Sequence, residues 1–169
     1  MEHILEGKTL ANQIKEHLPK RASFIAKHLG RKARLIGLGW KGDSAGFYYL
    51  NKEIESARKI GVDADIVLID ENTTEKNFFL VLDTIFSRQD IDALLIPRPL
   101  PPQLNHLDIS AHINPKQDID GAGLISMGHL FMCKTWEQVE NLGNGFFTTI
   151  SALSGDIRQL SSSKLTLQG

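Results

Sequence analysis

The stretch ADIVLIDENTTEKNFFLVLDTIF, residues 64–86, reads as a strand followed by a helix. Residues 64–70 are mostly apolar and β-branched and are bounded by turn formers, which is typical of a buried strand. Residues 72–75 offer a helix N-cap, and the apolar side chains that follow lie on one helical face. Those side chains are Phe78, Phe79, Leu82, Ile85 and Phe86. A strand that leads into an amphipathic helix is the repeating unit of a parallel α/β sheet.

The same alternation extends outward in both directions. Strands are predicted at residues 33–40, 64–70 and 92–96, and further helices at residues 8–29 and 46–60. Pro19 either kinks the first helix or divides it into two. The order implies a three-layer α/β/α fold whose mostly parallel sheet has helices on both faces. Because ligands of such sheets bind beyond the carboxyl ends of the strands, chemistry is expected at residues 40–52, 70–74 and 97–102.

The pattern weakens from Asn114 onward. Residues 114–123 are rich in turn formers and predict a loop. Residues 135–142 predict a short helix and residues 146–150 a short strand. We expect one domain over residues 1–150, followed by a tail at residues 151–169.

Composition excludes several classes of protein. Nineteen Lys and Arg residues against twenty Asp and Glu residues leave a formal net charge of −1, which gives no field for nucleic acid or an anionic membrane. No run approaches the ~18 apolar residues of a membrane span. Cys133 is the single cysteine, so an intrachain disulfide and a cysteine-cluster zinc site are excluded. The histidines show no metal-ligand spacing and the N-terminus no secretory leader, so we expect a cytoplasmic protein without a metal site.

Gly37, Gly39 and Gly42 match the dinucleotide fingerprint G-x-G-x-x-G after a strand, and Asp70 closes the next strand, where a ribose-binding acid would stand. In the true fingerprint the glycines themselves open the helix, so that its N-terminus meets the pyrophosphate. Here several residues separate Gly42 from the helical pattern, and the bulky Trp40 suits a phosphate poorly. The alternative interpretation is that these are strand and turn glycines.

Two further patterns could carry chemistry. Tyr48 and Lys52 lie four residues apart on a predicted helix, so that an aromatic ring and an amine project from one face. The alternative is a packed tyrosine and a lysine that extends to solvent. Asp118 and Asp120 place two carboxylates in a turn, where either could bind a ligand or simply hold the turn through backbone hydrogen bonds.

Four segments with compatible spacing follow one another: residues 5–11 (LEGKTLA), 43–62, 93–101 (ALLIPRPLP) and 113–121 (INPKQDIDG). Together they resemble the bifunctional methylenetetrahydrofolate dehydrogenase/cyclohydrolase family, in its folate-binding catalytic domain. The resemblance covers residues 4–130. It implies oxidation of 5,10-methylenetetrahydrofolate by NADP, then hydrolysis of the methenyl product to 10-formyltetrahydrofolate. It also implies a homodimer and a small-molecule folate as the ligand.

The resemblance assigns roles to particular residues. Tyr48 would stack on the folate rings, Lys52 would be the general acid/base, and Asp120 would bind the amino-pyrimidine edge of the pterin. The wall of the substrate cleft would be formed by Pro97, Pro99, Leu100 and Pro101.

Departures from the family pattern leave three hypotheses. Pro97 replaces a glutamine that bonds the catalytic lysine, and proline has no side-chain donor or acceptor. Residues 151–169 stand where the family's NADP-binding Rossmann domain should begin, so we expect no cofactor-binding residue in this chain. The hypotheses are the catalytic domain alone, with impaired activity; a degenerate, non-catalytic folate-site binding or regulatory module; and a nucleotide-binding α/β domain that uses Gly37, Gly39 and Gly42.

Overall fold

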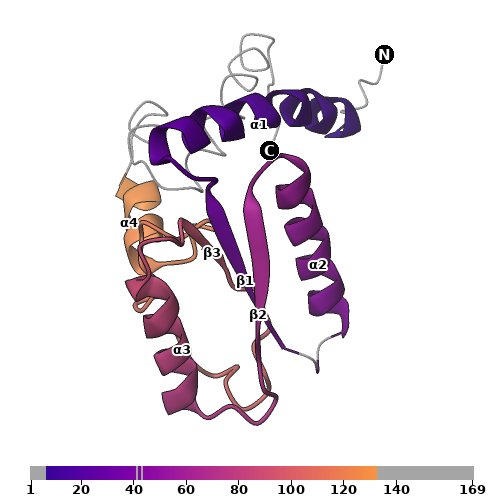
Figure 1. Ribbon diagram of the computed structural model, residues 1–169. Coiled ribbons are helices and arrows are strands. Elements are labelled where there is room, and N and C mark those ends of the chain that lie inside the picture. The colour runs from indigo at the N-terminus through magenta and orange to yellow at the C-terminus, as the bar shows by residue number, and fades with distance from the viewer. Residues whose placement is uncertain (1–6, 41, 43, 133–169) are drawn as a thin grey trace, which may run out of the picture. The chain divides into compact units, whose positions relative to one another are not determined.

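A computed structural model describes residues 7–40, 42 and 44–132 (Figure 1). In chain order the elements are α1 (Gly7–Leu29), β1 (Arg34–Trp40), α2 (Ser44–Lys59), β2 (Asp63–Ile69), α3 (Glu75–Ser87), β3 (Ala93–Leu95) and α4 (Leu124–Met132). The predicted strands and the first three helices are confirmed to within about two residues at each end. The predicted helix at 135–142, strand at 146–150 and tail lie outside the described residues, and the single domain over residues 1–150 stays a prediction.

The chain divides into two compact units. The first comprises the residues up to Asp92 together with Ile96–Asn105, and the second comprises Ala93–Leu95 and the residues from His106 onward. The first unit therefore holds α1, β1, α2, β2 and α3. The second holds β3, the turns that follow the proline-rich segment, and α4.

The sheet has the strand order β2-β1-β3, and β1 pairs with β2 in parallel, from Arg34 opposite Asp63 to Trp40 opposite Ile69. Figure 1 shows α2 and α3 on opposite sides of β1 and β2. The predicted α/β fold with helices on both faces is confirmed.

The helix α3 forms as the sequence predicts. Thr74 is its N-cap, with an extended backbone and a side-chain oxygen that accepts a hydrogen bond from the Asn77 N–H at 3.3 Å. Phe78, Leu82 and Ile85 are its buried residues, at the spacing of one helical face. They join a core that also contains Ile36 and Leu38 of β1.

α1 continues through Pro19, so of the two sequence-based alternatives the structure excludes a division of the helix at that residue. Pro19 lies on an exposed side of the helix, where the lost backbone hydrogen bond is tolerated more easily. The helix α4 was not predicted. Ser126 lies on its buried face and is 1% exposed, whereas the apolar Phe131 is 89% exposed. The positions of the apolar residues therefore do not indicate which face of α4 is buried.

None of the helices in the described part of the chain is long and apolar enough to cross a membrane.

Candidate functional site

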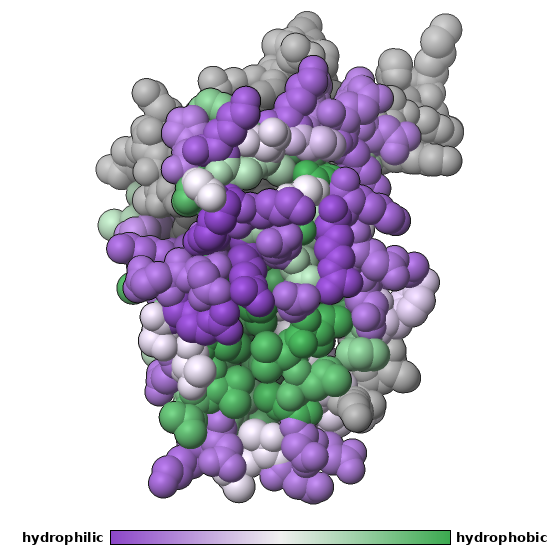
Figure 2. All heavy atoms as spheres, in the orientation of Figure 1, coloured by the Kyte–Doolittle hydropathy of each residue, from purple (hydrophilic) through white to green (hydrophobic). Residues whose placement is uncertain are grey.

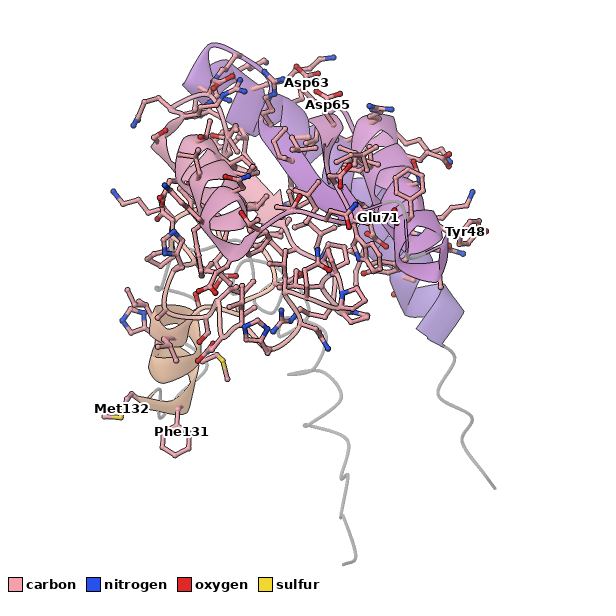
Figure 3. The ribbon with its side chains drawn as sticks, turned by 90° about the horizontal axis from the view of Figure 1, so that it is seen from below. Tyr48, Asp63, Asp65, Glu71, Phe131 and Met132 are labelled. Atoms are coloured by element: carbon pink, nitrogen blue, oxygen red, sulfur yellow. The ribbon has the colours of Figure 1, made fainter. Side chains whose placement is uncertain are left out.

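The first turns of α2 bring Tyr48 and Lys52 together. Because α2 begins at Ser44, shortly after β1 ends at Trp40, these turns lie at the carboxyl edge, by which we mean the carboxyl ends of β1 and β2 and the connections that leave them. The Lys52 Nζ lies 5.5 Å from the centroid of the Tyr48 ring. Tyr48 is 66% exposed, and Figure 3 shows its ring projecting outward from the helix. An accessible ring and an accessible amine therefore share one face.

The Lys52 ammonium also forms an ion pair with Glu55, at 3.4 Å between Nζ and Oε2. This pair joins residues three apart on the same helix, and both side chains are about half exposed. Such pairs contribute little to stability, about 0.3–0.5 kcal/mol at most. A ligand can therefore draw the amine away at little cost.

The proline-rich segment Pro97–Pro102 is irregular, as predicted, and its members differ in burial. Leu100 is 4% exposed and Pro101 is among the fully buried side chains. Pro97 is half-buried and Pro99 is exposed. Leu100 and Pro101 therefore anchor the segment in the core. Of the four predicted wall residues, Pro97 and Pro99 are the ones that a ligand can reach.

Two side chains that the sequence did not single out as site residues form hydrogen bonds at or next to this segment. The Trp40 indole N–H donates to the Pro99 carbonyl at 3.4 Å, and the Gln103 amide donates to the carbonyls of Glu71 and Thr73, the latter at 3.2 Å. Glu71 follows β2 and lies at the carboxyl edge in Figure 3. Hydrogen bonds to backbone carbonyls require no particular residue type in the partner, so no sequence pattern reveals them.

Packing accounts for the three glycines of the fingerprint. A Cβ atom at Gly37 would lie 2.5 Å from Leu50 Cδ1, and one at Gly39 would lie 2.9 Å from Leu50 Cδ2. At Gly42 it would lie 1.9 Å from the Trp40 ring. The glycines thus admit α2 and an indole ring rather than a pyrophosphate, and the turn does not fit a dinucleotide.

In the second unit, the two acids of the predicted turn behave differently. Asp118 is 3% exposed, and its carboxylate accepts hydrogen bonds from the N–H groups of Ala122 at 3.0 Å and Gly123 at 2.9 Å. A Cβ at Gly123 would come within 3.0 Å of that carboxylate, so glycine allows the turn to close. Asp120 is exposed. Asp118 therefore holds the turn, and Asp120 is the acid that solvent or a ligand can reach.

Within residues 7–40, 42 and 44–132, no group of three His, Cys, Asp or Glu residues is placed to hold a metal ion.

Comparison with known proteins gives a consistent result. Residues 5–120 match the model of the tetrahydrofolate dehydrogenase/cyclohydrolase catalytic domain, a range that contains every predicted site residue. The bifunctional protein FolD of Elusimicrobium minutum is 44% identical over 137 residues, which are 81% of this chain and 48% of that protein. FolD of Staphylococcus haemolyticus is 30% identical over 76% of this chain and 45% of its own length. The chain thus spans about half the length of these curated relatives.

Solved structures agree. A 5,10-methylenetetrahydrofolate dehydrogenase from the silkworm Bombyx mori superposes with a TM-score of 0.71 and 28% identity, covering 77% of this chain and 45% of that one. A Trypanosoma brucei methylenetetrahydrofolate dehydrogenase-cyclohydrolase, complexed with NADP and an inhibitor, has a TM-score of 0.67 at 19% identity, over 77% of this chain and 44% of that one. The second likeness shows the fold alone.

Proposed function

Because the chain belongs to the tetrahydrofolate dehydrogenase/cyclohydrolase family, through that family's catalytic domain, we propose that it binds a tetrahydrofolate and hydrolyses the 5,10-methenyl form to 10-formyltetrahydrofolate. The observation that carries the proposal is the Tyr48–Lys52 pair, with the amine 5.5 Å from the centroid of an exposed ring. A flat heterocycle can stack on that ring while its reacting carbon faces the amine.

The reaction needs one group that moves protons. Water attacks the methenyl carbon and forms a C–O bond, the bond from that carbon to N5 breaks, and N5 takes up a proton. In this proposal the Lys52 side chain acts in its neutral form: it accepts a proton from the attacking water and returns that proton to N5, and the second water proton goes to solvent. The resemblance also assigns the amino-pyrimidine edge of the pterin to Asp120 of the second unit, whose side chain is exposed, and this assignment stays a prediction.

The dehydrogenase half of the family's chemistry stays a proposal on resemblance alone. It would use NADP, which the Trypanosoma brucei relative was solved with. The Gly37, Gly39 and Gly42 turn does not fit that cofactor, so we derive no hydride-transfer step from these residues. The same resemblance supports a homodimer, which light scattering of the purified chain would test. The cytoplasmic location expected from the sequence stays a prediction.

Pro97 favours a second candidate, a folate-site binding or regulatory module without catalysis. A proline cannot bond the Lys52 amine through its side chain, and that amine pairs instead with Glu55. Both candidates predict folate binding. Only the first predicts that the purified chain accelerates the disappearance of methenyltetrahydrofolate, followed by its absorbance.

Calorimetric titration with tetrahydrofolate tests the binding that both candidates require. Tyr48→Ala should weaken binding roughly two- to tenfold, because a stacked aromatic pair contributes about 0.5–1.5 kcal/mol beyond its buried area. Tyr49→Ala is the matched control, since Tyr49 is 53% exposed and points about 100° away around the helix. Equal affinities for wild type and Tyr48→Ala would contradict the assignment of the ring.

A further inference from the structure

We propose that Trp40 and Gln103 are positioning residues that hold the proline-rich segment Pro97–Pro102 at the carboxyl edge and so set its distance from the Tyr48–Lys52 pair. This inference rests on the proposed function, because it names the residues that preorganise the same folate site. All these residues belong to the first unit.

The composition of the segment explains why side chains must hold it. Four of its six residues are proline, and proline has no backbone N–H to donate. The segment therefore cannot be tied down by a ladder of sheet hydrogen bonds and offers mainly carbonyl acceptors. Apolar burial of Leu100 and Pro101 fixes its middle. The carbonyls of Pro101 and Pro102 accept hydrogen bonds from the backbone N–H groups of Leu104 and Asn105, so the exposed Pro99 is the part that needs another restraint.

The two side chains supply that restraint at different points. Trp40 is the last residue of β1, and its indole N–H donates to the Pro99 carbonyl at 3.4 Å. Gln103 directly follows the segment, and its amide donates to the carbonyls of Glu71 and Thr73, in the connection that leaves β2. The segment is thus tied to the ends of both strands.

Trp40 also connects the segment to the helix that carries the ring and the amine. Its indole covers Gly42 so closely that a Cβ there would lie 1.9 Å from the ring. Gly42 lies two residues before the start of α2, which carries Tyr48 and Lys52. One side chain therefore contacts both the segment and the turn that leads into α2, and it lies half-exposed at the edge where ligand would bind.

The test separates the two restraints from general stability. Trp40→Phe keeps a ring over Gly42 and removes the N–H donor, and Gln103→Leu removes the amide. Each should raise the dissociation constant for tetrahydrofolate about three- to tenfold, the equivalent of one lost hydrogen bond, with little change in thermal midpoint. Gln13→Leu, on the exposed side of α1, is the matched control and should bind as wild type.

A spectroscopic readout reports on the position of the segment directly. The chain has two tryptophans, so Trp136→Phe leaves Trp40 as the only indole emitter. Tetrahydrofolate should change the Trp40 emission in this background, and adding Gln103→Leu should shrink the change at equal ligand saturation, because the segment is then less firmly held.

The outcomes distinguish this inference from the proposed function. If both restraint variants bind tetrahydrofolate as tightly as wild type while Tyr48→Ala binds more weakly, the positioning role is wrong and the folate site stands. If the wild-type protein binds no tetrahydrofolate, both the proposed function and this inference are wrong. The positioning role is also wrong if the restraint variants bind tetrahydrofolate more weakly, unfold at a lower temperature and show no effect of Gln103→Leu on the Trp40 emission change. A general loss of stability would then explain the weaker binding.

Discussion

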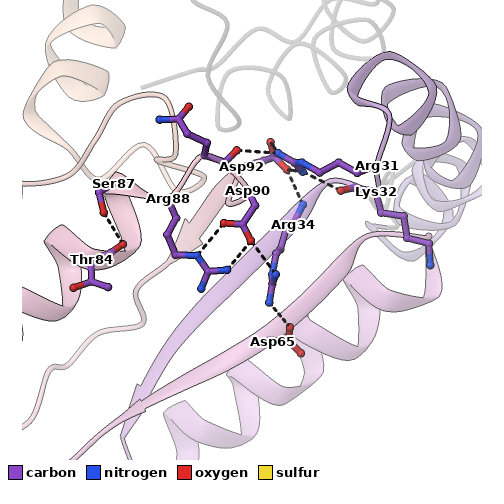
Figure 4. A network of polar contacts seen from close by, with 10 residues as sticks. Arg31, Lys32, Arg34, Asp65, Thr84, Ser87, Arg88, Asp90 and Asp92 are labelled. Carbon is purple, nitrogen blue, oxygen red and sulfur yellow. Dashed lines mark hydrogen bonds and ion pairs between the residues drawn. The ribbon is translucent and has the colours of Figure 1, made fainter.

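The two ends of the strands in the first unit are built from different contacts. At the amino edge, where β1 and β2 begin, charged side chains from separate segments neutralise one another (Figure 4). At the carboxyl edge, the Lys52 ammonium pairs with a residue of its own helix, and the restraints on the proline-rich segment run from neutral side chains to backbone carbonyls. Figure 2 shows the same contrast on the surface, with apolar side chains over the carboxyl-terminal half of β2 and hydrophilic ones over its start.

The amino-edge network is dense. Arg31 donates to both oxygens of Asp92 at 2.6 and 3.0 Å, and the Arg34 backbone N–H donates to the same carboxylate at 2.7 Å. The Arg34 guanidinium pairs with Asp90 at 3.0 Å and with Asp65 at 3.4 Å. These contacts link residues 31–34, the start of β2 and the loop before β3.

Electrostatics agree with the geometry. The Arg88 guanidinium, which donates to Asp90, lowers the pKa of that carboxyl to about 2. Desolvation opposes ionisation of Asp92, but hydrogen bonds from Arg31 and the Arg34 backbone outweigh it, and the pKa of Asp92 also lies below its usual value. The charged side chains at the amino edge therefore stabilise the fold by pairing with one another, whereas the Lys52 amine and the Tyr48 ring at the carboxyl edge are accessible to a ligand.

The largest expected effect comes from removing the amine. Lys52→Met should lower the rate of methenyltetrahydrofolate hydrolysis about a hundredfold or more, because a positioned acid/base typically contributes that much. Its free energy of unfolding should change by less than about 0.5 kcal/mol, since only an exposed pair is lost. Lys59→Met, in the last turn of the same helix, is the control. A large loss of stability in Lys52→Met would contradict the conclusion that Lys52, unlike the charged residues of the amino edge, contributes little to folding.

Restoring the glutamine that the family resemblance implies is the next test. Pro97→Gln should raise the hydrolysis rate roughly tenfold to a hundredfold, because a hydrogen bond to a charged group contributes about 1.5–3 kcal/mol when it is felt fully in the transition state. Steady-state assays of both proteins at saturating substrate would measure it. An unchanged rate would mean that Lys52 does not depend on a partner at this position.

A stability effect of intermediate size is expected at the amino edge. Asp92→Ala should lower the free energy of unfolding by about 2 kcal/mol, since three hydrogen bonds to one carboxylate are lost. Asp63→Ala breaks only the Lys32 pair, which is 3.7 Å long and about 60% exposed, and should cost less than about 0.5 kcal/mol. Urea unfolding would compare the two. The affinity for tetrahydrofolate should be the same in both variants. A lower affinity in Asp92→Ala alone would mean that the amino edge affects the ligand site at the carboxyl edge.

The smallest effect is the dependence of stability on pH. The folded-state pKa of Asp90 lies below its usual value of 3.8, so its ionised form favours folding. This contribution is complete above about pH 4 and is lost as the pH falls through about 2. Urea unfolding between pH 5 and pH 2 should show a shallower decline for Asp90→Asn than for wild type. Parallel curves for the two proteins would mean that solvent screens the Arg88–Asp90 pair.

Local patterns determined the elements and part of the site. The N-cap at Thr74, the apolar face of α3 and the strand at residues 63–69 follow from side-chain chemistry within a few residues. The neighbouring placement of Tyr48 and Lys52 also follows, because residues four apart share a helix face in any surroundings. The same reasoning did not predict α4, because a search for periodicity assumes that the apolar face of a helix is buried, whereas that of α4 is exposed.

The α/β class, the family resemblance and the pair on α2 could all be predicted from the sequence, because each follows from short local patterns and their order along the chain. Long-range packing then chose between alternatives that the chain left open. It assigned Gly37, Gly39 and Gly42 to packing, because Leu50 and the Trp40 ring occupy the space that a side chain there would need. It separated Asp118, which closes a turn, from the exposed Asp120, and it revealed the bonds from Trp40 and Gln103. Burial and hydrogen bonds to backbone carbonyls depend on which segments meet in space, and the local pattern does not specify that.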